Sequence, residues 1–266
     1  MLERPVGWAI KTGVRGVARA FAGPESLGEP LVPKPRNPDP VVLLNGFSCD
    51  NEMFAPWTRS LQRDGFDVYV AKLPNNALGD IPASARYVSN FIDGVKEKTG
   101  AKKVDVVGYS EGGLVARTYT KLLGGAANVD SQVHVGTPNN GVVHPVLDQV
   151  LDKVPFVRSA IPDAGEQMFK GSDLMKQLNN GKREPGIKRI TSMYAEDLDG
   201  IVFPSRSPVL QGANNIALNG NDWLPFLDGP NHLAMIQSSE QAYLVARAAL
   251  ATPRNKRPPT SLPERY

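Results

Sequence analysis

Residues 104–123, VDVVGYSEGGLVARTYTKLL, constrain the fold of this chain more than any other segment. They begin with a short, mostly apolar run, Val104–Val107, which predicts a strand. After Gly108-Tyr109-Ser110-Glu111-Gly112 comes a stretch rich in Leu, Val and Ala, Gly112–Leu123, which predicts a helix. The glycines allow a sharp turn without Cβ clashes. A strand that leads through a tight turn into a helix is a building unit of a parallel sheet covered by helices.

The same alternation of strand and helix extends over the first 140 residues and returns near the end of the chain. A continuous apolar run predicts a strand at Val41–Leu44. Further strands are predicted at Phe66–Ala71, Val104–Val107, Val133–Val135 and Ile187–Ala195, with a weaker one at Ile216–Leu218. Helical spacing of apolar residues predicts helices at Ile81–Lys98, Gly112–Leu123 and His232–Ala251. We therefore expect an α/β fold with a mostly parallel central sheet flanked by helices.

Residues 143–185 interrupt this alternation and predict a small helical insertion. Val146, Leu147 and Val150 follow helical spacing, and a second short helix is predicted at Ser172–Leu178. If the insertion lies over the end of the sheet, these three apolar residues are candidates to bind substrate in a groove or beneath a lid. Ordinary packing of the insertion on the sheet is the alternative.

The chain divides into a central domain and two flanking segments. Residues 1–39 predict an N-terminal helix followed by a proline-rich lead-in, residues 40–252 form the domain, and residues 253–266 predict a disordered tail. Lys11, Arg15 and Arg19 recur every four residues and so share one helix face. That face is either the solvent side of a docked helix or a surface for anionic partners.

Composition narrows the function classes. The 266 residues carry 30 Lys and Arg against 27 Asp and Glu, scattered along the chain, which argues against a nucleic-acid-binding protein. The single cysteine, Cys49, excludes an internal disulfide and an all-cysteine metal site, and we expect neither metal nor cofactor.

No apolar run reaches the roughly 20 residues of a membrane span. The charged N-terminus lacks the core of a signal peptide. With a presequence removed, a secreted or cell-envelope location is favoured over a cytoplasmic one.

Ser110 is a candidate nucleophile, and a serine needs a base that is held by an acid. When the serine lies on such a strand–turn–helix, the chain order is Ser, then Asp or Glu, then His. His134 lies on a predicted strand and is expected in the core, and His144 follows Ser110 too closely to leave room for the acid's strand. His232, after a Gly-Pro-Asn turn at a helix start, fits this order.

The acid is expected after the strand Ile187–Ala195, where several carboxylates compete. Asp199 is followed by Gly and an apolar pair that would hold the loop down and turn the carboxylate inward, so we favour it over Asp197. Asp222 and Asp228 lie too near His232 and follow no convincing strand.

Acyl transfer also requires two N–H donors for the oxyanion. The residue after the nucleophile supplies one, and here it is Glu111. The turn after Val41–Leu44 supplies the second, for which we favour the Phe47 N–H, although Asn45-Gly46 is also explained as a simple turn. The Glu111 side chain lies at a helix N-terminus, where a carboxylate is favourable, so we assign it no chemistry. Cys49 is expected to be a small filler residue rather than a reactive thiol.

From about Pro40 to Leu250 the chain resembles the bacterial α/β-hydrolase lipases and esterases, in particular the actinobacterial proteins similar to triacylglycerol lipases. The resemblance rests on NGF, DNEMFAPWTRSLQRDGFDVYV, GDIPASARYV, TGAKKVDVVGYSEGG, GTPNNG, GSDLMKQLNNG, DGIVFP, GANNI and NHL. It implies the α/β-hydrolase fold and a serine ester hydrolase with the triad Ser110, Asp199 and His232 and the oxyanion donors Phe47 and Glu111. Relatives commonly have His where this chain has Asn45 and Tyr109, and Gln or Met where it has Glu111.

The implied partner is an ester or lipid substrate, with transient contact to a lipid surface, and Tyr109 is a candidate substrate-binding residue beside Ser110. Triacylglycerols, short esters and polyesters all remain open as substrates. An acyltransferase of the same fold and a non-catalytic binding protein are the rival classes, and the second is disfavoured because every part of the triad is present. The sequence specifies no oligomeric state.

Overall fold

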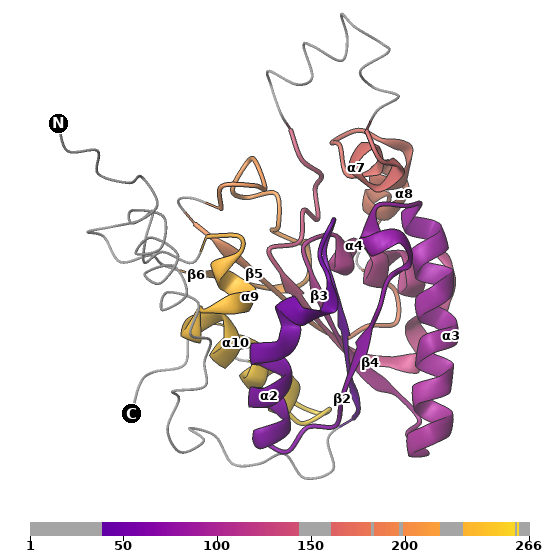
Figure 1. Cartoon of the computed structure of the whole chain (residues 1–266), viewed down its shortest axis with the longest axis vertical. Coiled ribbons are helices and arrows are strands. Elements are labelled where there is room, and N and C mark those ends of the chain that lie inside the picture. The colour runs from indigo at the N-terminus through magenta and orange to yellow at the C-terminus, as the bar shows by residue number, and fades with distance from the viewer. Residues whose placement is uncertain are drawn as a thin grey trace, which may run out of the picture.

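In the part of the chain that the structure describes, the centre of the protein is a six-stranded sheet in which all neighbouring strands are parallel (Figure 1). The computed structural model describes residues 39–143, 161–181, 184–196, 199–218, 231–258 and 260. Within them the strand order is β2-β1-β3-β4-β5-β6. The strands are β1 (Val41–Leu44), β2 (Val68–Ala71), β3 (Val104–Tyr109), β4 (Val129–Val135), β5 (Arg189–Ala195) and β6 (Asn214–Leu218). The predicted α/β fold with a mostly parallel sheet is confirmed.

Helices cover both faces of this sheet. The α-helices are α2 (Ala55–Arg63), α3 (Ile81–Thr99), α4 (Glu111–Arg117), α7 (Asp163–Gln167), α8 (Asp173–Asn179), α9 (Ala234–Gln237) and α10 (Glu240–Ala251). Shorter helical turns are η2 (Asn51–Phe54), η3 (Pro74–Ala77), η4 (Thr118–Leu122) and η5 (Gly125–Asn128). Figure 1 shows α3 on one side of the sheet and α2 with α10 on the other.

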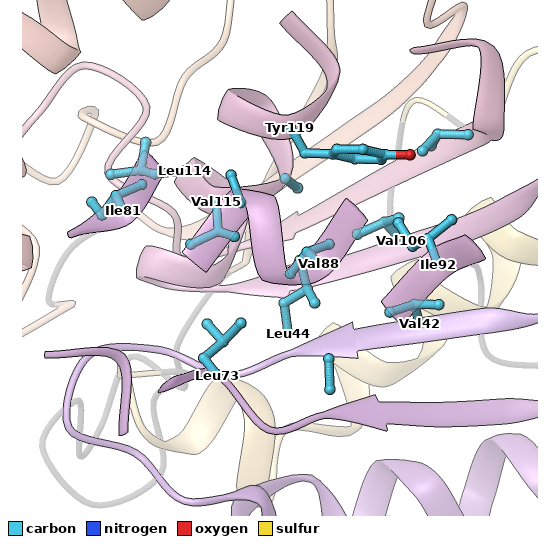
Figure 2. Close-up of a cluster of buried hydrophobic side chains, with 14 of the residues drawn as sticks. Val42, Leu44, Leu73, Ile81, Val88, Ile92, Val106, Leu114, Val115 and Tyr119 are labelled. Carbon is cyan, nitrogen blue, oxygen red and sulfur yellow. The ribbon is translucent and has the colours of Figure 1, made fainter. Parts of the chain in front are cut away.

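Alternate residues of the strands enter the two cores. Val42 and Leu44 of β1 join the cluster formed with α3 and α4, which Figure 2 shows with Leu114 and Val115. Val41 and Leu43 join the second cluster, with Trp57 of α2 and Tyr243 of α10. Because both faces are covered, every residue of β1 is buried, and this explains why its sequence is a continuous apolar run.

Three helical regions differ from the sequence-based expectation. The predicted helix Gly112–Leu123 is α4 followed by one π-helical turn, where the Thr118 and Thr120 hydroxyls donate to carbonyls four residues earlier. The predicted helix His232–Ala251 is broken, because Ser239 caps a new helix by accepting from the Ala242 N–H at 3.2 Å. The patterns considered above do not predict α2.

Several expectations fall on residues outside the described ranges. These are the N-terminal helix with its three cations, the substrate-binding candidates Val146, Leu147 and Val150, and the last residues of the tail. The described part of the insertion contains α7 and α8. At the start of the predicted tail, the Arg254 guanidinium donates to both carboxylate oxygens of Asp39, at 2.6 and 2.7 Å. Among the described helices, none has the length and apolar character of a membrane span.

Candidate active site

Ser110 occupies a strained turn between β3 and α4. Its φ is 51° and its ψ is −122°, a backbone conformation that is costly for any residue but glycine. Two hydrogen bonds hold this conformation: the Ser110 N–H donates to the Val135 carbonyl at 2.8 Å, and the Gly113 N–H donates to the Ser110 carbonyl at 3.1 Å. The strain is therefore held by the neighbouring strand β4 and by the first turn of α4.

Two glycines allow the chain to close around this serine. A Cβ on Gly112 would lie 2.2 Å from the Leu44 carbonyl oxygen, so α4 begins directly against the end of β1. A Cβ on Gly46 would lie 2.9 Å from the Ser110 Cβ, so the turn after β1 lies directly over the serine. Both close approaches require a residue without a side chain.

His232 and Asp199 form a buried pair. His232 Nδ1 lies 2.9 Å from the Asp199 carboxylate, and the His232 backbone N–H donates to the Asp199 carbonyl at 2.8 Å. The carboxylate also accepts from the backbone N–H groups of Ile201 at 3.2 Å and Val202 at 2.6 Å. The backbone after Asp199 thus orients the carboxylate toward the histidine. Of the expected apolar pair, Val202 is buried but Ile201 is exposed, so only Val202 packs the loop inward.

Ser110 and His232 line the same cavity, which has a volume of about 370 Å³. Most of its wall is apolar and comes from segments far apart in the sequence, including Val142, Met168, Phe169, Ile201 and Leu233. A pocket that is apolar except for a few converging polar groups is the usual form of a small-molecule site. A larger, more polar cavity of about 480 Å³ lies between α7 and α8 and contains neither Ser110 nor His232.

Tyr109 lies in the cavity wall, but its polar end is engaged with the histidine. Its ring centroid is 5.0 Å from that of His232, with the two planes at 37°, and its hydroxyl donates to the His232 carbonyl at 3.1 Å. Burial raises the pKa of the Tyr109 hydroxyl. Tyr109, predicted to bind substrate, therefore helps to position His232 in this structure.

The turn at residues 45–49 presents Phe47 to the cavity. The Cys49 N–H donates to the Gly46 carbonyl at 3.1 Å, the Cys49 thiol donates to the Phe47 carbonyl at 3.3 Å, and the Asn45 amide donates to the Cys49 carbonyl. Burial, followed by the charges of Asp50 and Glu111, raises the Cys49 pKa to about 11. The thiol is therefore protonated at neutral pH and is a weak nucleophile.

The state of the Glu111 side chain differs from what the sequence predicts. We expected an ionised carboxylate stabilised by the helix N-terminus, but burial raises the Glu111 pKa to about 9. The side chain is fully buried, and neither carboxyl oxygen has a hydrogen-bond partner among the described residues. The packing of the α4 N-terminus against β1 causes this burial, and no local sequence pattern reports it.

Of the other histidines and aspartates considered as base or acid, the structure describes only His134. His134 is fully buried, with Nε2 3.0 Å from the Gln132 side-chain oxygen, and burial lowers its pKa to about 3, as suits the expected core residue. His144, Asp197, Asp222 and Asp228 lie outside the described residues.

Among the described residues, three carboxylates have a spacing that could hold a metal ion. They belong to Asp39, Asp105 and Asp130, and their oxygens lie within 4.8 Å of one another. Arg189 and Arg254 already pair with this group. Ion pairing therefore accounts for the cluster.

The model of the α/β hydrolase fold family matches residues 39–230. The chain belongs to this family. A curated triacylglycerol lipase from Burkholderia plantarii is 30% identical to this α/β hydrolase over 150 residues. The match covers 52% of this chain and 40% of that lipase, so the chain spans less than half of its relative's length.

Two solved structures show the same fold. The mature Bacillus licheniformis lipase BlEst2 matches with a TM-score of 0.63 at 16% identity, over 84% of this chain and 96% of that chain. Aspergillus fumigatus lipase B matches with a TM-score of 0.61 at 17% identity, over 86% of this chain and 55% of that chain. At these identities the likeness concerns the fold alone.

Proposed function

We propose that this α/β hydrolase is a serine carboxylic-ester hydrolase, with Ser110 as nucleophile, His232 as base and Asp199 as the acid that orients the base. The observation that carries the proposal is the meeting of Ser110, on its strained turn, with the Asp199-bound His232 in one apolar cavity. A nucleophile, a base and a group that orients the base are the minimum set for acyl transfer through serine.

In the proposed reaction, His232 Nε2 takes the proton of the Ser110 hydroxyl while the serine oxygen attacks the ester carbonyl. The Asp199 carboxylate on Nδ1 holds the tautomer that leaves Nε2 free to accept and then stabilises the imidazolium. The Phe47 and Glu111 N–H groups bind the oxyanion. His232 then protonates the departing alcohol, and water hydrolyses the acyl-enzyme by the same route.

The substrate class follows from the cavity wall and from the relatives. Apolar side chains around Ser110 fit the acyl part of an ester, and burying each methylene contributes about 0.8 kcal/mol. The curated relative is named a triacylglycerol lipase, and the two structural neighbours are named lipases. We therefore assign an acyl ester of an apolar acid, which includes lipids.

Contact with a lipid surface is part of this proposal. Ile201 and Leu233 line the cavity and are 50% and 43% exposed, and Phe203, two residues beyond Ile201, is 56% exposed. Large apolar side chains that are exposed together beside a pocket mark an interaction surface, whereas scattered single ones do not. The position of Ile201 and Leu233 in the cavity wall fits a substrate that lies in a lipid aggregate.

The test combines active-site labelling with turnover. A fluorophosphonate probe should modify Ser110, and Ser110→Ala should abolish both labelling and the hydrolysis of nitrophenyl esters. Ser60→Ala, which alters another buried serine, on α2, should retain both. Ester hydrolysis that survives Ser110→Ala would refute the mechanism.

Product analysis with an added short alcohol separates the rival classes. A hydrolase forms mainly the free acid, an acyltransferase forms mainly the new ester, and a binding protein forms neither.

A further inference from the structure

Glu111 is a carboxyl that the protein encloses without giving it a partner. Its side chain has no exposed surface, and neither Oε1 nor Oε2 has a hydrogen-bond partner among the described residues. Buried polar groups in folded proteins are nearly always hydrogen-bonded, so an exception requires an explanation. This exception lies directly after Ser110, at the first residue of α4.

The packing of α4 keeps the carboxyl in place. The next residue, Gly112, fits so closely against the end of β1 that a Cβ there would lie 2.2 Å from the Leu44 carbonyl oxygen and 2.7 Å from that of Asn45. The start of the helix therefore has no room to shift and carry Glu111 to solvent. A second buried acceptor without a partner, Asn45 Oδ1, belongs to the same junction.

Such an environment favours the neutral carboxyl. Removing an unpaired carboxylate from water costs several kcal/mol, whereas a helix N-terminus stabilises an anion by about 2 kcal/mol at most. The first effect is larger, in agreement with a pKa near 9 that burial alone raises. At neutral pH the residue whose N–H binds the proposed oxyanion thus carries an uncharged side chain.

We propose that Glu111 must remain protonated for the oxyanion hole to work, so that loss of this one proton sets the upper pH limit of the reaction. The inference rests on the proposed function and assigns Glu111 a role beyond its N–H. The charge of an ionised Glu111 acts on Cys49 of the turn at 45–49, so this side chain would add a fixed negative charge beside the turn that supplies the proposed Phe47 donor. In a buried site such like charges repel strongly, because little water screens them.

The other ionisable groups around this junction do not compensate for such a charge. Cys49 of the turn at 45–49 and Tyr109 of β3 are both neutral, because burial raises the pKa of each. His232 is bound to Asp199. Burial lowers the pKa of His134 on β4, so this side chain is neutral too.

The cations of the neighbouring helical elements are also engaged elsewhere. Arg117, at the end of α4, pairs with Glu184, and Lys121 of η4 donates to the Leu178 and Asn180 carbonyls. From α3, the residues that share the core with α4 are apolar, among them Ile81, Ala85 and Val88. No cation among the described residues pairs with Glu111.

The test is the pH dependence of kcat/KM for an uncharged ester, compared between the wild type and Glu111→Gln, which keeps the shape of the side chain but cannot ionise. In the wild type, kcat/KM should fall about ten- to a hundredfold from about pH 8 to about pH 10.5, with an inflection near 9. In Glu111→Gln this inflection should be absent when each profile is scaled to its own maximum. Near-ultraviolet circular dichroism over the same range separates the effect from unfolding.

Two controls address other titrating groups. Asp105→Asn removes a different buried carboxyl, on β3, and should keep the wild-type inflection. Cys49→Ser removes the other ionisable group near the oxyanion turn and should also keep it. An inflection that persists unchanged in Glu111→Gln, or that disappears in Cys49→Ser, would overturn the proposal.

The outcome also distinguishes this inference from the proposed function. Ester hydrolysis that survives Ser110→Ala refutes the function, whereas an inactive Ser110→Ala combined with a wild-type alkaline limb in Glu111→Gln refutes the role of Glu111 alone.

If Glu111→Gln fails to fold, infrared difference spectra of the Ser110→Ala protein replace it. A protonated-carboxyl band that persists at pH 7 and is lost near pH 9 supports the proposal, and its absence at pH 7 contradicts it.

Discussion

The Tyr109 hydroxyl donates to the His232 backbone carbonyl at 3.1 Å, and the two rings pack with centroids 5.0 Å apart. The residue before the proposed nucleophile therefore supports the proposed base, which lies 123 positions later in the chain. This contact connects the end of β3 to the segment that carries His232. It provides a physical reason for an aromatic residue at position 109.

Removing the Tyr109 hydroxyl should leave His232 less firmly positioned, while the aromatic ring still packs against it. We expect Tyr109→Phe to lower kcat roughly three- to tenfold with little change in KM, and to cost about 1 kcal/mol of stability. The measurement is a comparison of kcat, KM and urea unfolding with the wild type. Tyr69→Phe, which loses an exposed hydroxyl bonded to Asp67 at 2.9 Å, is the matched control and should leave kcat unchanged. An equal loss of kcat in both variants would contradict the role of Tyr109.

The contact between Asp199 and His232 predicts a large effect on turnover. Asp199→Asn should favour the wrong histidine tautomer and lower kcat by about 10⁴-fold while the fold is retained, a magnitude taken from the serine protease triad. Steady-state kinetics with Ser110→Ala as the zero-activity reference measure the effect. Asp197→Asn tests the alternative acid and should remain close to the wild type. If Asp197→Asn is the variant that loses activity, the assignment of the acid is wrong.

Much of the fold and of the candidate site follows from local patterns. A parallel strand buried on both faces is mostly apolar, and this is why β1 stands out as a continuous apolar run, whereas β3 also carries the buried Asp105. The order Ser110, Asp199, His232 is likewise visible, and the structure brings the last two to 2.9 Å.

What could not be predicted depends on contacts between distant segments. The neutral state of Glu111 results from the fit of α4 against β1, and the role of the Tyr109 hydroxyl results from a contact with His232. The helix α2 could have been found, because Trp57 and Leu61 are four residues apart and both are buried.

Glu111 should also make stability depend on pH. Its pKa is raised from an ordinary 4.5 to about 9 in the folded protein, so between these values the folded state binds more protons than the unfolded state. The free energy of unfolding therefore decreases as pH rises through this window, by up to about 1.4 kcal/mol per pH unit, and levels off above it.

Glu111→Gln should remove this contribution, so the variant should gain stability relative to the wild type from pH 5 to pH 9. Urea unfolding at several pH values measures the difference. Asp105, whose pKa burial also raises, is present in both proteins and cancels in the comparison. A difference that stays constant with pH would show that Glu111 ionises normally.

Replacing glycine by alanine should have opposite effects on stability at two positions, Gly112 at the contact between α4 and β1 and Gly94 inside α3. Gly112→Ala should strongly destabilise the protein, by roughly 3 kcal/mol or more, because its Cβ would meet the Leu44 carbonyl at 2.2 Å. Gly94→Ala, inside α3, should stabilise the protein by about 0.5–1 kcal/mol, because nothing beyond its own stretch of helix lies within 4 Å of the added Cβ. Thermal and urea unfolding check both variants, and a well-tolerated Gly112→Ala would contradict the close packing.

The exposed apolar side chains beside the cavity predict a difference between dissolved and aggregated substrates. Phe203→Ser removes the most exposed of them and should reduce binding to zwitterionic phospholipid vesicles and turnover of an emulsified ester. Turnover of a soluble short ester should change little, because Phe203 is not among the residues that line the cavity. Vesicle cosedimentation and parallel rate measurements test this expectation. Leu123→Ser, which removes a 42% exposed apolar side chain at the end of η4, is the matched control. An equal loss of vesicle binding in both variants would mean that exposed apolar area in general, rather than the cavity rim, holds the protein on lipid.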